Sequence, residues 1–343
     1  MVDLNEQEAA AFVALQRGVP LSEYPFAEIG SRLGLSEEGV LALVRRLLDK
    51  GEARRFGAVF DARRLGYRSA LCAMTVPRVR MSEVAAKVSA VRGVTHAYER
   101  GWPVELPDTL PGGPAGFSWP NMWFTLAAPA MDFSRELEAL RAACQPFAIH
   151  ALPATRRFKI DVVFDVRTRD RDERVEPRLP LVKAPALVVE LDAREKALVQ
   201  LLQGDLPICA RFFEPLAQQA GLSELALLEQ VRAWQASGVL RRVGLLVRHR
   251  EIGFKANGMC CWDVPSAEVT EAGRRVADFP EVTHCYERPR MDIFPFRLYA
   301  MIHTPTWRST QQLFERITRE AGLSGGQLLL SVTEFKKTSM QFF

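Results

Sequence analysis

Hydrophobic residues recur at helical spacing in the first part of this chain. Between residues 25 and 51 apolar side chains fall three or four positions apart, which is typical of amphipathic helices. The turn at Gly34 to Ser36 separates two such helices, with a serine placed to cap the second and Gly51 placed to end it. The segment ARRFGAVFD at 53–61 then predicts a short strand pair. Together these signals indicate a helix-turn-helix with a wing.

Beyond the wing, alternating apolar and polar positions predict strands, separated by further helical segments. We expect strands at 70–76, around 94–100, at 122–127, and at 158–164 or just before it, with helices at 82–91 and 133–144. This order, β-α-β-β-α-β, is that of a ferredoxin-like sandwich.

The whole pattern occurs twice. GEARRFGAVFDARRLGY (51–67) corresponds to GVLRRVGLLVRHREIGF (238–254) at an offset of 187 residues, and VTHAYER (94–100) to VTHCYER (282–288) at 188. Repetition at this spacing predicts an α+β chain built from two tandem copies of one domain pair. The expected domains are a winged helix-turn-helix at 1–67, a ferredoxin-like domain at 68–166, a charged and proline-containing linker at 167–187, and the second copies at 188–254 and 255–343.

One insertion distinguishes the copies. Residues 102–120 of the first copy are rich in glycine and proline and contain two tryptophans. They predict a loop, which either covers an apolar surface or is a tolerated surface insertion.

Composition narrows the class of protein without naming a function. The 343 residues are 48% hydrophobic and 25% charged, with a net charge of +4, as in ordinary soluble proteins. No apolar run reaches membrane-spanning length and the N-terminus is polar, so we expect a cytoplasmic protein. The six cysteines form no pair of CxxC motifs, which argues against zinc and iron–sulfur sites.

A winged helix-turn-helix followed by a ferredoxin-like domain is the plan of the Lrp/AsnC transcription regulators, so DNA binding has to be weighed. Reading bases requires Arg, Lys, Asn or Gln at the start of the recognition helix. Here the candidate helices begin Ser36-Glu37-Glu38 and Ser223-Glu224-Leu225. We therefore expect no sequence-specific DNA binding, and the arginines of the wings are free to bind phosphates or carboxylates.

The strongest chemical signal is the repeated motif T-H-x-Y-E-R. Alternate residues of a strand share a face, so the histidine, tyrosine and arginine of each copy should point the same way. An imidazole, a phenol and a guanidinium together supply proton donors and a carboxylate clamp. The alternative is a structural network at a domain interface. The two sets are His96, Tyr98 and Arg100, and His284, Tyr286 and Arg288.

His249 breaks the repeat, because Ala62 stands at the corresponding position of the first copy. An unmatched histidine between Arg248 and Arg250 suggests a role kept by one copy only, as an acid or an axial iron ligand, or else a solvated surface residue. His303 also lacks a repeat partner, and we expect it to be structural.

At this point a family resemblance becomes specific. The second half resembles the siroheme decarboxylase branch of the Lrp/AsnC superfamily through LLVRHREIGFKANGM (245–259), FPEVTHCYERP (279–289) and TEFKKTSMQFF (333–343). The first half resembles the partner subunit of those enzymes through RRFGAVFDARRLGY (54–67), GVTHAYER (93–100) and NMWFTL (121–126). One departure is Arg297, which stands where the first copy has Asn121.

The resemblance implies a fused siroheme decarboxylase that removes CO₂ from the acetate groups on rings C and D. The product would be 12,18-didecarboxysiroheme, on the way to haem d1 or another haem. It also implies that siroheme is bound as substrate without a separate cofactor, and that the fused chain forms a homodimer. The alternatives are a DNA-binding regulator, with or without haem as its effector, and a tetrapyrrole-binding protein without chemistry.

Residue roles follow from the same resemblance. We expect His249, His284 and Tyr286 to act on iron or on the carbon of the departing acetate, with His96 and Tyr98 in a second site or padding the interface. Substrate carboxylates would be held by cationic side chains of the wings, the motifs and the tail: Arg54, Arg55, Arg100, Arg241, Arg242, Arg288 and Lys336.

Overall fold

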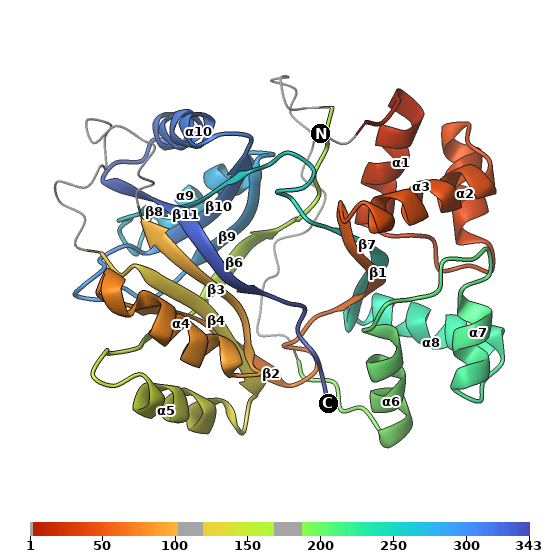
Figure 1. Ribbon diagram of the computed structural model, residues 1–343, viewed down its shortest axis with the longest axis horizontal. Helices are drawn as coiled ribbons and strands as arrows, with labels where there is room; N and C mark the ends of the chain where they lie inside the picture. The colour runs from red at the N-terminus through yellow and green to blue at the C-terminus, as the bar shows by residue number, and fades with distance from the viewer. Residues whose placement is uncertain (1–2, 102–118, 168–186) are drawn as a thin grey trace.

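A computed structural model describes residues 3–101, 119–167 and 187–343, and it divides them into a helical lobe and a sheet lobe (Figure 1). No helix of the described part is long and apolar enough to cross a membrane. The predicted α+β class with paired helix-turn-helix and ferredoxin-like units is confirmed. Most of the predicted linker and of the insertion at 102–120 lies outside the described residues.

The helical lobe contains both helix-turn-helix units around one hydrophobic core. Ser36 and Ser223 cap the second helix of each turn motif through the backbone N–H groups of Gly39 and Ala226, as their positions predict. The elements are α1 (Glu6–Arg17), α2 (Pro25–Leu33), α3 (Glu37–Asp49) and β1 (Ala53–Phe60), then α6 (Ala193–Leu202), α7 (Phe213–Gln219), α8 (Glu224–Ala236) and β7 (Leu240–Val247).

The two wings pair with each other. β1 and β7 form an antiparallel two-stranded sheet in which Gly57 lies opposite Gly244. Glycine is required at the centre, because a Cβ on Gly57 would lie 2.6 Å from the carbonyl oxygen of Gly204. Because β1 and β7 are hydrogen-bonded to each other, the wing sheet joins the two copies.

In the sheet lobe each copy has the ferredoxin-like strand order, β5-β2-β4-β3 and β11-β8-β10-β9. The first copy contains β2 (Tyr67–Met74), a short 3-10 turn (Arg78–Arg80), α4 (Met81–Ala90), β3 (Val94–Gly101), β4 (Met122–Pro129), α5 (Phe133–Ala143) and β5 (His150–Pro153). The second contains β8 (Ala256–Trp262), α9 (Val269–Ala277), β9 (Val282–Glu287), β10 (Leu298–Thr304), α10 (Trp307–Glu320) and β11 (Gly326–Lys337).

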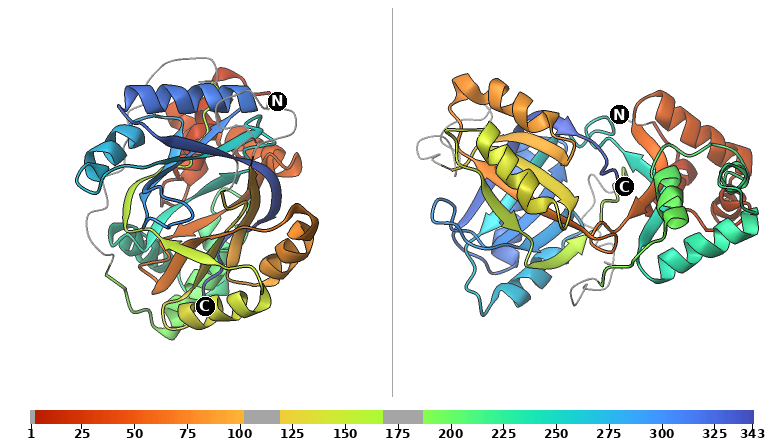
Figure 2. Two further views of the ribbon diagram at one scale, coloured as in Figure 1. Left: turned by 90° about the vertical axis from the view of Figure 1, so that its left-hand side faces the viewer. Right: turned by 90° about the horizontal axis from the view of Figure 1, so that it is seen from below.

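Each copy lends the end of its last strand to the other. The strand predicted at 158–164 or just before it is divided in two: β5 pairs with β2 of its own copy, and β6 (Arg156–Ile160) pairs with β9 of the other copy. The second half of β11 likewise pairs with β3. All nine strands form one sheet, β5-β2-β4-β3-β11-β8-β10-β9-β6. Only residues 154 and 155 separate β5 from β6, so the sheet curls until its two ends meet (Figure 2).

Helices cover the outer face of the curled sheet, and its inner face holds a separate apolar cluster that includes Trp123, Phe294 and Tyr299. Trp119 packs edge-on against Phe294 and Phe296, with ring centroids 5.5 and 5.6 Å away. The described end of the insertion therefore covers an apolar surface, as one of the two interpretations expects.

Candidate active site

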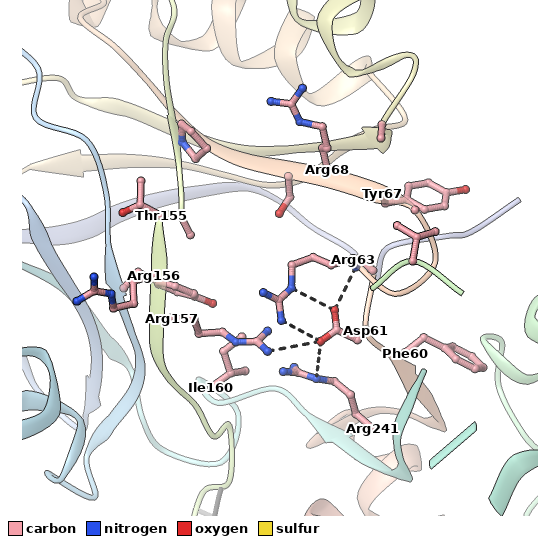
Figure 3. Close-up of a pocket in the computed structure, with 18 of the residues that line it drawn as sticks. Phe60, Asp61, Arg63, Tyr67, Arg68, Thr155, Arg156, Arg157, Ile160 and Arg241 are labelled. Atoms are coloured by element: carbon pink, nitrogen blue, oxygen red, sulfur yellow. Dashed lines mark hydrogen bonds and ion pairs between the residues drawn. The ribbon is translucent and has the colours of Figure 1, made fainter. Parts of the chain in front are cut away.

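A pocket of about 1020 Å³ lies where the wing sheet meets the sheet lobe (Figure 3). Its wall is formed by the residues after β1, the start of β2, the turn between β5 and β6, and the phenol of Tyr286 on β9. This volume is at the upper end for small-molecule sites and suits a large ligand.

Arginine dominates the lining of this pocket, which we call the arginine pocket. Its six arginines come from both copies and both lobes: Arg63, Arg68, Arg156, Arg157, Arg241 and Arg274. Planar guanidinium groups bind carboxylates through two parallel N–H donors. The pocket is therefore suited to a ligand with several carboxylates.

Asp61 is the one acid among the residues that line the pocket. Its carboxylate lies 3.4 Å from Arg63 Nε, 3.5 Å from Arg157 Nη2 and 3.9 Å from Arg241 Nε, as Figure 3 shows. Burial alone would raise the pKa of Asp61, but the hydrogen bond from Arg63 and the three positive charges outweigh it and lower the pKa. Asp61 is thus held as a carboxylate.

The motif on β9 brings a proton donor to this wall. A β-bulge lies beside His284, and Thr283 Oγ1 lies 3.1 Å from His284 Nδ1. The guanidinium of Arg288 lies 4.9 Å from the centre of the Tyr286 ring. Burial raises the pKa of Tyr286 against the opposing effect of the nearby arginines, so the phenol is protonated at neutral pH. Burial, helped by Arg241, Arg288 and Arg157, lowers the pKa of His284 to about 4.

The T-H-x-Y-E-R motif on β3 forms a corresponding cluster of side chains where β3 pairs with β11. Tyr98 is paired with Glu334 in the register in which Tyr286 is paired with Arg157. Arg100 lies 5.2 Å from the Tyr98 ring, and burial, with Lys337 and Arg54 contributing, lowers the pKa of His96 to about 3. We call this group the Tyr98 cluster: His96, Tyr98, Arg100, Arg54, Glu334 and Lys337.

Comparison with known proteins agrees with this architecture. An AsnC-like ligand-binding domain model matches residues 64–159 and 251–336, and a siroheme decarboxylase NirDL-like helix-turn-helix model matches residues 12–54 and 195–241. A siroheme decarboxylase of Hydrogenobacter thermophilus is 34% identical over 96% of this chain and 92% of its own length. The NirDL subunit of Paracoccus denitrificans is 34% identical over 84% of this chain and 82% of its own length.

This chain belongs to the siroheme decarboxylase family.

Solved structures of this family have the same fold. The crystal structure of the siroheme decarboxylase NirDL superposes with a TM-score of 0.70 at 30% identity, covering 98% of this chain and 94% of that one. NirDL in complex with an iron-uroporphyrin III analogue gives 0.69 over the same shares. A siroheme decarboxylase beta subunit from Methanosarcina barkeri, 36% identical, matches 44% of this chain and 99% of itself, so one such subunit corresponds to about half of this chain.

The sequence predicts that His249, His284 and Tyr286 act together, but the structure places His249 apart from the other two. Tyr286 and Arg241 line the arginine pocket, with His284 beside Tyr286. His249 does not line it. Its Nδ1 lies 2.8 Å from Lys337 Nζ and its ring stacks on Phe164, so it adjoins the Tyr98 cluster. The position of His249 gives no support to an axial-ligand role for a tetrapyrrole in the arginine pocket.

His249 is also not the solvated surface residue that one interpretation allowed, because it is 3% exposed. Its ring lies 4.7 Å from that of His303, which contacts Asn257 and Thr283. Burial lowers the pKa of His249 to about 3. His303 and Lys337 were missed as site neighbours, although both, like His249, have no counterpart in the first copy.

Of the seven predicted carboxylate-binding residues, Arg241 alone lines the arginine pocket. Arg54 and Arg100 belong to the Tyr98 cluster, and Arg288 lies over the Tyr286 ring. The other three lie elsewhere. Lys336 donates to the carbonyl oxygens of Ser89 and Val91 at the end of α4, outside the curled sheet. Arg55 donates to the carbonyl oxygens of Gln203, Gly204 and Ala58 and so braces the helical lobe. Arg242 is not among the residues that line the arginine pocket.

Proposed function

We propose that this chain decarboxylates siroheme in the arginine pocket. The observation that supports this most directly is the combination of six arginines with the protonated phenol of Tyr286 in a pocket of about 1020 Å³, within a decarboxylase fold. Siroheme carries eight carboxylates, so a pocket that binds it must offer many guanidinium groups. The named substrate of the relatives and the iron-uroporphyrin III analogue bound by NirDL point to the same class of ligand.

In the proposed reaction an acetate side chain loses CO₂ and becomes a methyl group. The electron pair of the broken C–C bond passes to the methylene carbon, where the macrocycle delocalises it, and Tyr286 then delivers a proton to that carbon. Arg288 over the ring, together with Arg157 and Arg241, stabilises the resulting phenolate until solvent returns the proton. Neutral His284 beside Tyr286 is suited to relaying that proton.

The finer assignment follows the family resemblance. We propose that the acetates on rings C and D leave, giving 12,18-didecarboxysiroheme for haem d1 or another haem, without a separate cofactor. The wings pair with each other, and Arg241 of the second wing lines the arginine pocket. This wing arginine is therefore not positioned to bind DNA, which disfavours the DNA-binding alternative. Homodimerisation of the fused chain remains a prediction.

Anaerobic incubation with siroheme followed by mass spectrometry of the tetrapyrrole tests the proposal. We expect loss of two CO₂ masses with the wild type. Tyr286→Phe should lower turnover about 100-fold, because a positioned general acid contributes about that much. Tyr98→Phe is the matched control and should keep most activity. The reverse result would move the productive site to the Tyr98 cluster, and a changed absorption spectrum with unchanged mass would indicate a carrier.

A further inference from the structure

Asp61 is an unexpected residue in a pocket for anions. A fixed carboxylate repels substrate carboxylates, yet this one is surrounded by three of the arginines that would bind them. Its side chain is 11% exposed, and the backbone N–H of Arg63 also donates to it at 3.1 Å. Asp61 is therefore held in place.

The contacts of Asp61 are shared and long. Charge-assisted N–H···O bonds have distances of about 2.7–2.9 Å. Here the three guanidinium groups approach to 3.4, 3.5 and 3.9 Å, and Arg157 and Arg241 each make one contact. One carboxylate thus balances the repulsion among three cations without saturating their donors. A ligand carboxylate at shorter range would bind the same arginines more tightly.

The repeat shows the same arrangement with its charges exchanged. Asp61 corresponds to Arg248, and Arg157, paired with Tyr286, corresponds to Glu334, paired with Tyr98. Arg241 and Arg63 correspond to Arg54 and Arg250. Each set of corresponding positions therefore contains three arginines and one acid, although the acid comes from the wing in one set and from the last strand in the other. The acid is Asp61 in one set and Glu334 in the other, at positions that do not correspond. Both sets therefore keep one carboxylate among three arginines.

We propose that Asp61 is a positioning and specificity-determining residue, whose carboxylate takes the place of a substrate carboxylate among these arginines until substrate binds. It holds Arg63, Arg157 and Arg241 where an acetate or propionate group binds, and its charge limits how strongly the pocket retains tetrapyrroles with many carboxylates. This inference rests on the proposed function for the class of ligand only. Its direct consequence is that removing the charge tightens binding while impairing turnover.

Asp61→Asn keeps the shape of the side chain and removes its charge. The probes are iron uroporphyrin III, with eight carboxylates, and iron coproporphyrin III, with four, titrated by absorbance. We expect the dissociation constant of the first to fall about tenfold and that of the second about threefold, because juxtaposed like charges oppose binding. With siroheme, KM should fall and kcat should fall as well, because the arginines lose their fixed positions. Asp263→Asn, which breaks an exposed pair with Arg290 outside the pocket, is the matched control and should change neither.

A double variant tests whether the net charge of the arginine pocket matters more than the position of its one carboxylate. Asp61→Arg alone should bind iron uroporphyrin III more tightly than wild type, and adding Arg157→Glu, which copies the arrangement at Arg248 and Glu334, should restore the wild-type preference between the two probes. If Asp61→Asn leaves both affinities unchanged, or weakens both equally with a lower melting temperature, the inference is wrong and Asp61 is a structural brace. Wild-type protein that binds both probes but releases no CO₂ from siroheme would refute the proposed function alone.

Discussion

Lys336 tests whether a cationic side chain that the sequence predicts to bind substrate has a structural role instead. The ammonium group donates to the carbonyl oxygens of Ser89 at 2.8 Å and Val91 at 2.9 Å, at the C-terminal end of α4. Cations stabilise this end of a helix, where carbonyl groups lack partners. Lys159, its repeat counterpart, donates in the same way to Phe279 at 2.7 Å, after α9. The similar hydrogen bonds in the two copies indicate that each lysine links the C-terminal end of a helix to the strand that pairs with the other copy.

We therefore expect Lys336→Met to lower the free energy of unfolding by about 2 kcal/mol. Hydrogen bonds from a charged group contribute about 1.5–3 kcal/mol each, and partial exposure of Lys336 reduces the sum of the two. Urea denaturation followed by circular dichroism measures the loss, and titration with iron uroporphyrin III should show unchanged affinity. Lys159→Met is the matched variant, with a loss of similar size. Weaker porphyrin binding at unchanged stability would refute this reasoning and reinstate Lys336 as a substrate-binding residue.

Two further predictions concern the stability of the sheet lobe. Burial holds the pKa of His96 and His249 at about 3 and that of His284 at about 4, below the usual 6.5, so their contribution to stability is complete above pH 6.5 and is lost as the pH falls toward 3. The melting temperature should fall over that range, and less steeply in His249→Gln; a flat profile would contradict the assignment. Gly273→Ala should cost about 2 kcal/mol by overpacking, because its Cβ would lie 2.6 Å from Phe158 Cδ2. Gly204→Ala, whose Cβ meets nothing closer than 3.8 Å, is the control, and equal losses in both would refute the packing argument.

Much of the fold is predictable because helix and strand periodicities are local properties. The caps at Ser36 and Ser223, the succession of helices and strands along each copy and the shared face of the T-H-x-Y-E-R side chains all follow from short stretches of sequence. The repeat strengthens each of these predictions, because two independent segments give the same pattern.

Alternation fails where a bulge interrupts it. The register shifts between Glu334 and Lys336, so counting alternate residues along the tail does not identify the lysine that faces inward. Lys337, and not Lys336, reaches His249. The same shift occurs between Arg157 and Lys159 in the first copy. Only the hydrogen-bond register of the assembled sheet shows this change of face.

By itself, then, the sequence determined the domain types, their duplication and the residue types that carry chemistry, since these depend on local periodicity and on the repeat. Tertiary structure alone decided that the wings pair, that β6 crosses to the other copy, that Tyr286 pairs with Arg157 and lines one pocket with Asp61, and that His249 contacts Lys337. These contacts join segments more than 80 residues apart. Their partners depend on how two similar copies pack together, and the sequence pattern of either copy alone does not specify that packing.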